Sequence, residues 1–486
     1  MPLILGTNSI KDTGYDVANS CRFNDGDSPY MYKDLGTATA GSGSKFTFSV
    51  WVKRGVLGTD QYLFSGGVPA SNHLVDLCFK DDDTMRFRLI YNDTTYGHLR
   101  TDAKFRDVSA WYHIVINMDT TQGTAANRTK MYVNGSQVTS FSTSTRPNED
   151  STFTVNNNTV NSQRKSIGRN EDSSGDHFDG YMAEAVWIDG TAYAASSFGE
   201  FNEDSPNIWQ PVDVSGLTFG THGFYLDFEA SDNLGNDANG GTDLTESGLA
   251  AIDQCVDSPT NNYNTMNPLV FRTTSGTKYS PTFSEGNTYL VSTNDATYDI
   301  SGGTFMLSSG KWYFEWKANG VGDTAADFSN CAGIKPADGS WAGTSAYAGT
   351  NRVYGASGKK CDSASTVATY GSTWTTNDII GCYVDLDNYK IYFAKNGTMQ
   401  NSADVSAGTG FAFDDLDDHD SWIVYTSLAD FGVGSQSGSY FNFGNPTWSL
   451  SSAVTDANGY GSFEYNPTED GVDFYALCTK NLAEYG

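Results

Sequence analysis

Apolar and polar residues alternate with a period of two along much of the chain, and this period predicts β-strands. The clearest stretches are 46–54 (FTFSVWVKR), 111–119 (WYHIVINMD) and 310–318 (GKWYFEWKA). Each of them should present one apolar face to a core. Long runs with the 3.6-residue period of helices are missing, and the sequence suggests only a short helix at 194–200. The pattern predicts an all-β fold.

Two stretches have the sequence of a tight β-hairpin. Residues 130–138 (KMYVNGSQV) and 391–399 (IYFAKNGTM) each contain an Asn-Gly pair after an apolar strand pattern. Asn-Gly supplies the two residues of positive φ that a type I′ turn needs. The sequences around the two pairs do not repeat. We therefore interpret them as one hairpin in each of two domains, and not as a functional motif that is used twice.

Strand-rich regions and a strand-poor region indicate the domain organisation. Many short strands joined by polar loops are typical of a two-sheet sandwich, whereas the Asn-, Thr- and Pro-rich stretch at 257–269 is typical of a linker. The sequence therefore predicts two antiparallel β-sandwich (jelly-roll-like) domains in tandem. The predicted parts are an N-terminal attachment segment at 1–19, a first sandwich at 20–252, a linker at 253–280, a second sandwich at 281–450 and a C-terminal tail at 451–486.

The chain is strongly acidic. Its 486 residues include 29 Lys and Arg against 58 Asp and Glu, which gives a net charge of −29. Such a field repels phosphate, so nucleic acid and anionic membranes are not expected as partners. The sequence predicts neither a signal peptide nor a membrane-spanning run of about 20 apolar residues. The seven cysteines are widely spaced without a CxxC pair, and we expect free, mostly buried thiols.

Several motifs of the first half resemble a laminin-G-like (concanavalin A-like) lectin domain. They are FTFSVWVKRG, WYHIVINMDTTQGTAANRTKMYVNG, SIGRN and FDGYMAEAVWIDG, in that order. The continuation SSFGEFNED, GTHGFYLDFEASDNLGND and DSPTNNYNTMNP resembles the variant of this domain in structural proteins of tailed phages. The second half is similar to a SPRY domain through GKWYFEWKA and DIIGCYVDLDNYKIYFAKNG. The closing FYALCTKNL also resembles phage proteins of this architecture.

The resemblance to tailed-phage proteins implies a setting and partners. It implies a virion structural protein, such as a fibre, spike or decoration subunit, that is displayed on the particle surface and contacts host surface glycan. Assembly in the host cytoplasm would explain why no export signal is recognisable. Phage fibres are usually trimers, so a homo-oligomer is expected. The segments 1–19 and 451–486 are the expected contacts with other virion proteins.

The sequence does not predict an enzyme. Glucanases of the concanavalin A-like superfamily place acids on one strand with the spacing E-x-D-x-E, so that they point into the cleft. This chain has no such triplet, and its nearest pairing, Asp385 and Asp387, lies at a predicted turn. The six histidines are scattered. Among them, His113 is expected to be a solvated strand residue and not a general base.

Acidic clusters are candidates for Ca²⁺, which binds six to eight oxygen ligands. The stretch FDDLDDHD contributes the candidate ligands Asp414, Asp415, Asp417 and Asp418, and residues 81–83 form a second acidic cluster. Laminin-G-like domains often hold one Ca²⁺ at an edge of the sandwich. Neither cluster has the spacing of a known calcium loop, so solvated turns are the alternative. No other cofactor is suggested.

Three aromatic residues are candidates for ligand binding. Trp341, Tyr347 and Tyr354 fall in a Gly-, Ala- and Ser-rich stretch that is predicted to be a long loop. Their rings could stack on sugar, because a pyranose presents an apolar side, or pack against a neighbouring subunit. Three functions therefore remain open: an adhesin that binds glycan, a purely architectural capsid or tail subunit, and a polysaccharide depolymerase.

Overall fold

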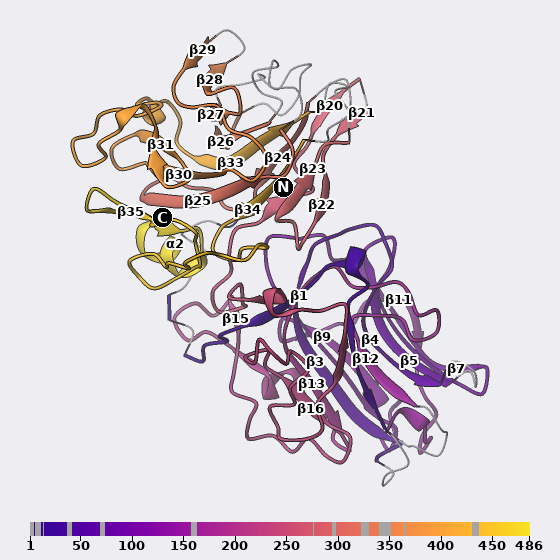
Figure 1. Ribbon diagram of the computed structural model, residues 1–486. Coiled ribbons are helices and arrows are strands. Elements are labelled where there is room, and N and C mark those ends of the chain that lie inside the picture. The colour runs from indigo at the N-terminus through magenta and orange to yellow at the C-terminus, as the bar shows by residue number, and fades with distance from the viewer. Residues whose placement is uncertain are drawn as a thin grey trace. The chain divides into compact units, whose positions relative to one another are not determined.

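A computed structural model shows that the chain forms two compact units. One contains Thr13–Thr260, and the other contains Met1–Asp12 together with Asn261–Gly486. The structure describes residues 4, 11–12, 14–35, 41–68, 73–156, 163–275, 277–293, 298–321, 330–339, 351–363, 366–429 and 437–486. In Figure 1 the strands of the first unit run from indigo to magenta and those of the second from rose to yellow.

The first unit is a sandwich of two mainly antiparallel sheets, each with eight strands in the described ranges. The strand order of one sheet is β10 (Ser136–Gln137), β9 (Thr129–Val133), β8 (Tyr112–Asp119), β3 (Lys45–Arg54), β13 (Gly180–Asp189), β1 (Ser20–Phe23) and β18 (Gln254–Cys255), with β16 (Phe224–Leu226) also pairing with β13. The order of the other is β11 (Phe141–Thr145), β7 (Thr94–Lys104), β6 (Thr84–Tyr91), β5 (His73–Phe79), β4 (Gln61–Val68), β12 (Arg164–Ile167), β2 (Tyr30–Asp34) and β17 (Thr245–Ser247).

The core of the first unit lies between these two sheets. The apolar residues that the period of two places on one face of β3 and β8 are buried in it, apart from the partly buried Tyr112, and this confirms the predicted strands. Trp187 lies near the middle of the core, with its ring 4.6 Å from that of Phe64 and 4.8 Å from that of Phe46. Short elements complete the unit: β14 (Gly199–Phe201), β15 (Trp209–Pro211), α1 (Ala125–Arg128), and the 3-10 helices η2 (Asp25–Asp27), η4 (Thr154–Asn156), η5 (Ala195–Ser197) and η6 (Ala251–Asp253). The helix expected at 194–200 is reduced to the single turn η5.

The second unit is also a two-sheet sandwich. Among the described residues, one sheet has the order β19 (Met266–Asn267), β24 (Asp299–Gly303), β33 (Trp422–Leu428), β26 (Asn330–Pro336), β27 (Arg352–Gly355), β28 (Lys359–Ser363) and β29 (Thr366–Thr369). The other has the order β22 (Thr282–Ser284), β23 (Tyr289–Val291), β34 (Gly438–Asn442), β25 (Lys311–Ala318), β30 (Ile379–Asp385), β31 (Lys390–Lys395) and β32 (Thr398–Met399). The predicted fold class, all-β with two sandwiches in tandem, is confirmed.

Short elements also accompany the second sandwich. They are the hairpins β20 (Arg272–Thr274) with β21 (Thr277–Tyr279) and β35 (Thr468–Glu469) with β36 (Val472–Asp473), the strand β37 (Tyr475–Ala476), the helix α2 (Thr479–Tyr485), and the 3-10 helices η7 (Gln400–Ser402) and η8 (Leu416–Asp418). Within the described ranges, no helix is long and apolar enough to cross a membrane. All seven cysteines are buried, as expected.

The two Asn-Gly pairs form turns of the same kind, one in each unit. Asn134 and Gly135 have φ values of 46° and 74°, and Asn396 and Gly397 have values of 47° and 75°. These are the positive φ values that a type I′ turn requires. They confirm the interpretation of two separate hairpins, β9–β10 and β31–β32.

Both ends of the chain belong to the second unit. Ile4 pairs with Phe305 in a parallel bridge, and β37 pairs in parallel with β25. The buried rings of Phe463 and Phe474 cover Tyr313 in a separate apolar cluster. The segment 451–486 therefore packs on its own sandwich, whereas we expected it to pack on a neighbouring protein. The segment 253–280, expected to be a linker, is divided between the two units.

Candidate functional site

The structure describes one of the three aromatic residues predicted to bind a ligand. Trp341 and Tyr347 lie outside the described residues. Tyr354 is in β27, where its side chain is fully buried and its hydroxyl donates a hydrogen bond to the backbone oxygen of Ser372. Its ring packs 5.4 Å from that of Phe393. The assignment of Tyr354 to an exposed binding loop is therefore wrong, because this residue is on the core side of a strand.

Two of the four carboxylates predicted to bind Ca²⁺ pair with a buried arginine instead. Arg352 donates from Nε to Asp415, 2.7 Å away, and from Nη2 to Asp418, 3.1 Å away. A buried guanidinium requires such partners, since an unpaired charge inside a protein is costly. Asp414 and Asp417 are exposed. No cluster of acidic, histidine or cysteine side chains in the described part of the chain could hold a metal, so the calcium prediction is not supported there.

The acidic cluster at 81–83 also forms ion pairs with arginine side chains. Asp83 accepts hydrogen bonds from Arg54 at 3.2 Å and Arg106 at 2.7 Å, and Asp82 pairs with Arg100 at 2.9 Å. These contacts fix the loop between β5 and β6. They give the cluster a structural role.

The sequence predicted a solvated side chain for His113, but this residue is fully buried. Its ring stacks on Trp51 with the ring centres 4.6 Å apart, Trp209 donates to its Nδ1 at 2.9 Å, and its Nε2 lies 2.8 Å from the hydroxyl of Ser49. Burial lowers the pKa of His113 to about 3, so the ring is neutral at physiological pH. The segment around Trp209 covers this side of β8, which the strand pattern alone could not reveal.

The sheet that contains β4 to β7 has a polar outer face. One row of outward residues crosses all eight described strands, in the order Thr145, His98, Arg88, Asp76, Ser65, Ser166, Tyr32 and Thr245. Arg86 and Arg100 are opposite each other in the adjacent row. We call the central group of this surface the arginine face, and it consists of Tyr62, Asp76, Arg86, Arg88, His98 and Arg100.

A single buried carboxylate organises the arginine face. Asp76 is 0% exposed, and it accepts hydrogen bonds from Arg86 at 3.1 Å and from Nε of Arg88 at 2.9 Å. Arg86 also donates to the hydroxyl of Tyr62 at 2.8 Å. Arg88 and Arg100 keep 23% and 32% of their side chains exposed. The face therefore carries three guanidinium groups, while Asp76 and the Asp82 partner of Arg100 supply two carboxylates. One positive charge remains in excess, on a chain of net charge −29.

Two buried nitrogen atoms of the arginine face have no hydrogen-bond partner among the described residues. They are Nε of Arg86 and Nε2 of His98. Burial, followed by the charges of Arg86 and Arg88, lowers the pKa of His98, so the imidazole is neutral near pH 7 and can donate or accept. Buried polar groups are normally paired. Because both atoms are covered, the charged groups that a ligand could reach on this face are the partly exposed guanidinium groups of Arg88 and Arg100.

Arginine–tyrosine pairs extend the same outer face over β12 and β2. The guanidinium of Arg164 lies 4.2 Å from the ring centre of Tyr32, and that of Arg169 lies 3.6 Å from the ring centre of Tyr30. Flat groups of this kind can pack against the apolar side of a sugar ring. The whole outer face therefore combines charged donors with flat stacking surfaces.

The arginine face has a signal in the sequence, although its residues were not among the predicted site residues. Residues 84–91 (TMRFRLIY) alternate arginine with apolar residues, and residues 96–101 (YGHLRT) place His98 and Arg100 at the same period. Because the apolar positions face the core, the intervening Arg-x-Arg and His-x-Arg residues must share the opposite face. The pairing of the two strands, and the approach of Asp76, depend on tertiary structure.

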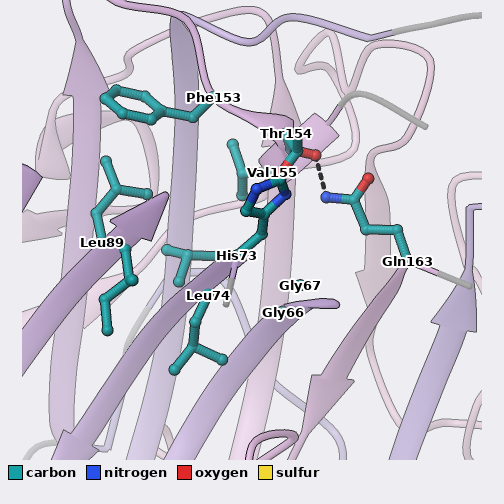
Figure 2. A pocket seen from close by; sticks show the side chains of 11 residues that line it. Gly66, Gly67, His73, Leu74, Leu89, Phe153, Thr154, Val155 and Gln163 are labelled. Carbon is teal, nitrogen blue, oxygen red and sulfur yellow. Dashed lines mark hydrogen bonds between the residues drawn. The ribbon is translucent and has the colours of Figure 1, made fainter. Parts of the chain in front are cut away.

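A small pocket lies at one end of the same sheet, beside η4 (Figure 2). It contains about 190 Å³ of empty space, part of it open to solvent, and its walls include Val75, Leu89 and Phe153. His73 and Gln163 line it, and each has one buried polar atom without a partner in the described ranges. Ligand pockets usually measure about 300–1,000 Å³. The pocket is thus too small for a sugar, and we assign no ligand to it.

A buried acid lies on β13 of the opposite sheet. Glu184 has a positive φ of 49° at a register shift in the strand, and its carboxyl group accepts a hydrogen bond from Tyr225 at 2.7 Å. Tyr15 continues the chain of hydroxyl groups, 3.3 Å from Tyr225. Burial raises the pKa of Glu184 to about 8. This carboxyl group is therefore mainly protonated at neutral pH.

Comparisons with known proteins give the class of each sandwich. Residues 25–195 match the family model of the concanavalin A-like lectin/glucanases superfamily, and residues 311–445 match that of the SPRY domain. A concanavalin A-like sandwich is thus followed by a SPRY sandwich, as the motifs suggested.

Solved structures resemble parts of the chain at low identity. The SPRY domain of human HERC1 is 15% identical, and the match covers 32% of this chain and 87% of that one, with a TM-score of 0.24. A SAP-like pentraxin from Limulus polyphemus is 15% identical over 36% of this chain and 78% of its own, with a TM-score of 0.26. The CBM40 of the Ruminococcus gnavus IT-sialidase is 12% identical, and the match covers 35% of this chain and 94% of that one, with a TM-score of 0.25.

Proposed function

We propose that the protein binds an acidic glycan through the arginine face of its first sandwich. The observation that carries this proposal is the cluster of three neighbouring guanidinium groups on this face. Two of them pair with the buried carboxylate of Asp76, and the third pairs with Asp82. Guanidinium groups bind carboxylate and other oxyanions through paired N–H donors. The lectin-type fold of residues 25–195 is compatible with this role.

Asp76 has two effects on the proposed site. It holds Arg86 and Arg88 in fixed positions, so little side-chain entropy is lost when a ligand binds. It also neutralises only part of their charge, which leaves an attraction for anions. The neutral His98 beside them would bind a sugar hydroxyl. A ligand with both acidic groups and hydroxyl groups fits these contacts best.

Replacing Arg100 by Gln or His98 by Ala should weaken glycan binding about tenfold or more. The reason is that one hydrogen bond to a charged group contributes about 1.5–3 kcal/mol, and 1.4 kcal/mol corresponds to a factor of ten. Binding would be measured on an array that carries uronic-acid, sialic-acid and sulfated glycans beside neutral ones. Calorimetry on the best ligand would follow.

The matched control is Lys130→Gln, which removes one positive charge from β9 in the other sheet of the same unit. It should leave the affinity unchanged. If only neutral glycans bind, or if the control weakens binding as much as Arg100→Gln does, the arginine face is not the site. If no glycan binds, the proposal fails and a purely architectural role is favoured.

For the biological setting, we propose a surface-exposed subunit of a tailed-phage virion that contacts the host, present as a homo-oligomer. The support is the resemblance of motifs within 196–268 and of the closing motif to phage structural proteins, together with the proposed glycan-binding face. The chain should be found in purified particles by mass spectrometry, and imaging of those particles should place it at the surface with the arginine face accessible. Absence from the particles would contradict the setting, and burial of that face between subunits would contradict host binding.

A further inference from the structure

Lys165 is a buried amine without a carboxylate partner among the residues that the structure describes. It lies in β12 on the core side, 0% exposed, with Nζ 4.5 Å from the ring centre of Trp187. The buried Lys53, by contrast, has the carboxylate of Asp257 at 2.7 Å. In the described part of the chain, no carboxylate lies within ion-pair distance of Lys165. Burial lowers the pKa of Lys165 well below its ordinary value, against the opposing charge of Asp189, and this favours the neutral amine with a free lone pair.

The side chain of Asn156 lies directly against this amine. Nζ of Lys165 is 2.6 Å from Oδ1 of Asn156, and both residues are fully buried. Nζ also donates a hydrogen bond to the backbone oxygen of His222 at 2.9 Å, which fixes its position. Asn156 comes from η4 and Lys165 from β12, so two separate elements bring the amine and the amide together.

The surroundings of Asn156 favour reaction at its side-chain carbon. Trp187 donates from Nε1 to the same Oδ1 at 2.9 Å, a donor that would stabilise negative charge developing on this oxygen. Nδ2 of Asn156 is buried and has no hydrogen-bond partner among the described residues. The amide nitrogen is therefore held by no other contact in those ranges and can leave. The aromatic rings around Trp187 keep water away from the reacting groups.

We propose that Lys165 and Asn156 join in an intramolecular amide bond that forms without an added enzyme. The lone pair of Nζ attacks Cγ of Asn156 and forms the new C–N bond. The bond between Cγ and Nδ2 breaks, one proton passes from Nζ to Nδ2, and ammonia leaves. No oxidant, reductant or cofactor is needed. The structure already holds the amine against the amide. The entropy cost of bringing two reactants together, a large part of the activation barrier for such reactions, is therefore removed.

The bond would tie η4 to β12 inside the core of the first sandwich. A covalent link of this kind restricts the unfolded chain and resists reducing agents, unlike a disulfide. Such a link would suit a protein that is displayed outside a cell and whose cysteines are all free, buried thiols, because it would take the place of disulfides. The inference stands on the geometry of the core, and it does not depend on the proposed glycan binding.

Mass spectrometry of the full chain tests the link. The intact wild-type protein should be lighter than its sequence mass by one ammonia. Trypsin should release residues 131–164 covalently joined to residues 165–169, because cleavage after Lys165 is blocked and the bond after Arg146 precedes a proline. The full sequence mass with cleavage after Lys165 would overturn the proposal, and this measurement requires no variant to fold.

Variants locate the loss of ammonia. Lys165→Met and Asn156→Ala should both restore the full sequence mass. The control is Lys335→Met, at another buried lysine whose Nζ lies 3.2 Å from an asparagine oxygen of Asn351 in the second unit, and this variant should keep the mass deficit. An ammonia loss that persists in Lys165→Met would arise elsewhere, such as at an Asn-Gly pair, and would overturn the proposal.

Discussion

Asp76→Ala should destabilise the first sandwich by about 3–5 kcal/mol, the typical cost of removing one partner from a buried ion pair. Asp76 is 0% exposed and is the shared partner of Arg86 and Arg88, whose side chains are only 12% and 23% exposed. Without the carboxylate, two guanidinium groups would face each other in a poorly solvated place. The change would be measured by urea unfolding of the full chain, following the transition assigned to residues 13–260.

The matched control for this prediction is Asp34→Ala. Asp34 pairs with Arg164 on the same outer face, but the two side chains are 54% and 36% exposed. Exposed pairs of this kind contribute about 0–1 kcal/mol. An equal cost for Asp76→Ala and Asp34→Ala would contradict the view that one buried carboxylate holds the arginine face together. If the Asp76 variant remains folded, its glycan affinity should also fall, because Arg86 and Arg88 lose their fixed positions.

Glu184→Gln should stabilise the first sandwich at pH 8 and leave its stability nearly unchanged at pH 4. The pKa of Glu184 is about 8 in the folded state, against an ordinary value of 4.5. Between these two values the folded chain keeps a proton that the unfolded chain has released. The free energy of unfolding therefore falls as the pH rises through this window. The total loss is roughly 3–5 kcal/mol, since one pKa unit corresponds to 1.36 kcal/mol.

The test compares the unfolding free energies of the wild type and Glu184→Gln at several pH values between 4 and 9. The difference between the two proteins should grow with pH and level off above about pH 8. Glu149→Gln, at a glutamate whose side chain is 53% exposed, is the control and should show no such trend. A difference that stays constant across the range would show that burial does not raise the pKa of Glu184 in the folded protein.

The sequence was sufficient to predict the fold class and the kinds of domain. The period of two placed the core residues of β3, β8 and β25 on the correct faces, since side chains of a strand must alternate. The Asn-Gly pairs identified the turns of β9–β10 and β31–β32 because few dipeptides tolerate two positive φ values. The quoted motifs identified the concanavalin A-like and SPRY domains, which the family models confirm.

Individual side chains were harder to place. Tyr354 was assigned to an exposed loop, but β27 turns it into the core. His113 was correctly placed on the outer side of β8 but predicted to be solvated, although a hairpin bearing Trp209 covers it. The aspartates at 415 and 418 were expected to bind a metal, but the buried Arg352 takes both. In each case a residue distant in the sequence determined the environment.

The sequence by itself determined which residues form strands, where the tight turns lie, and which families the two sandwiches resemble. These properties depend on local periodicity and on φ preferences, and both are set by residues that are adjacent in the sequence. Only the tertiary structure decided that Asp76 lies between Arg86 and Arg88, that Lys165 meets Asn156, and that both chain ends join the second unit. Strand order and register create these contacts, and they follow from packing the whole sandwich.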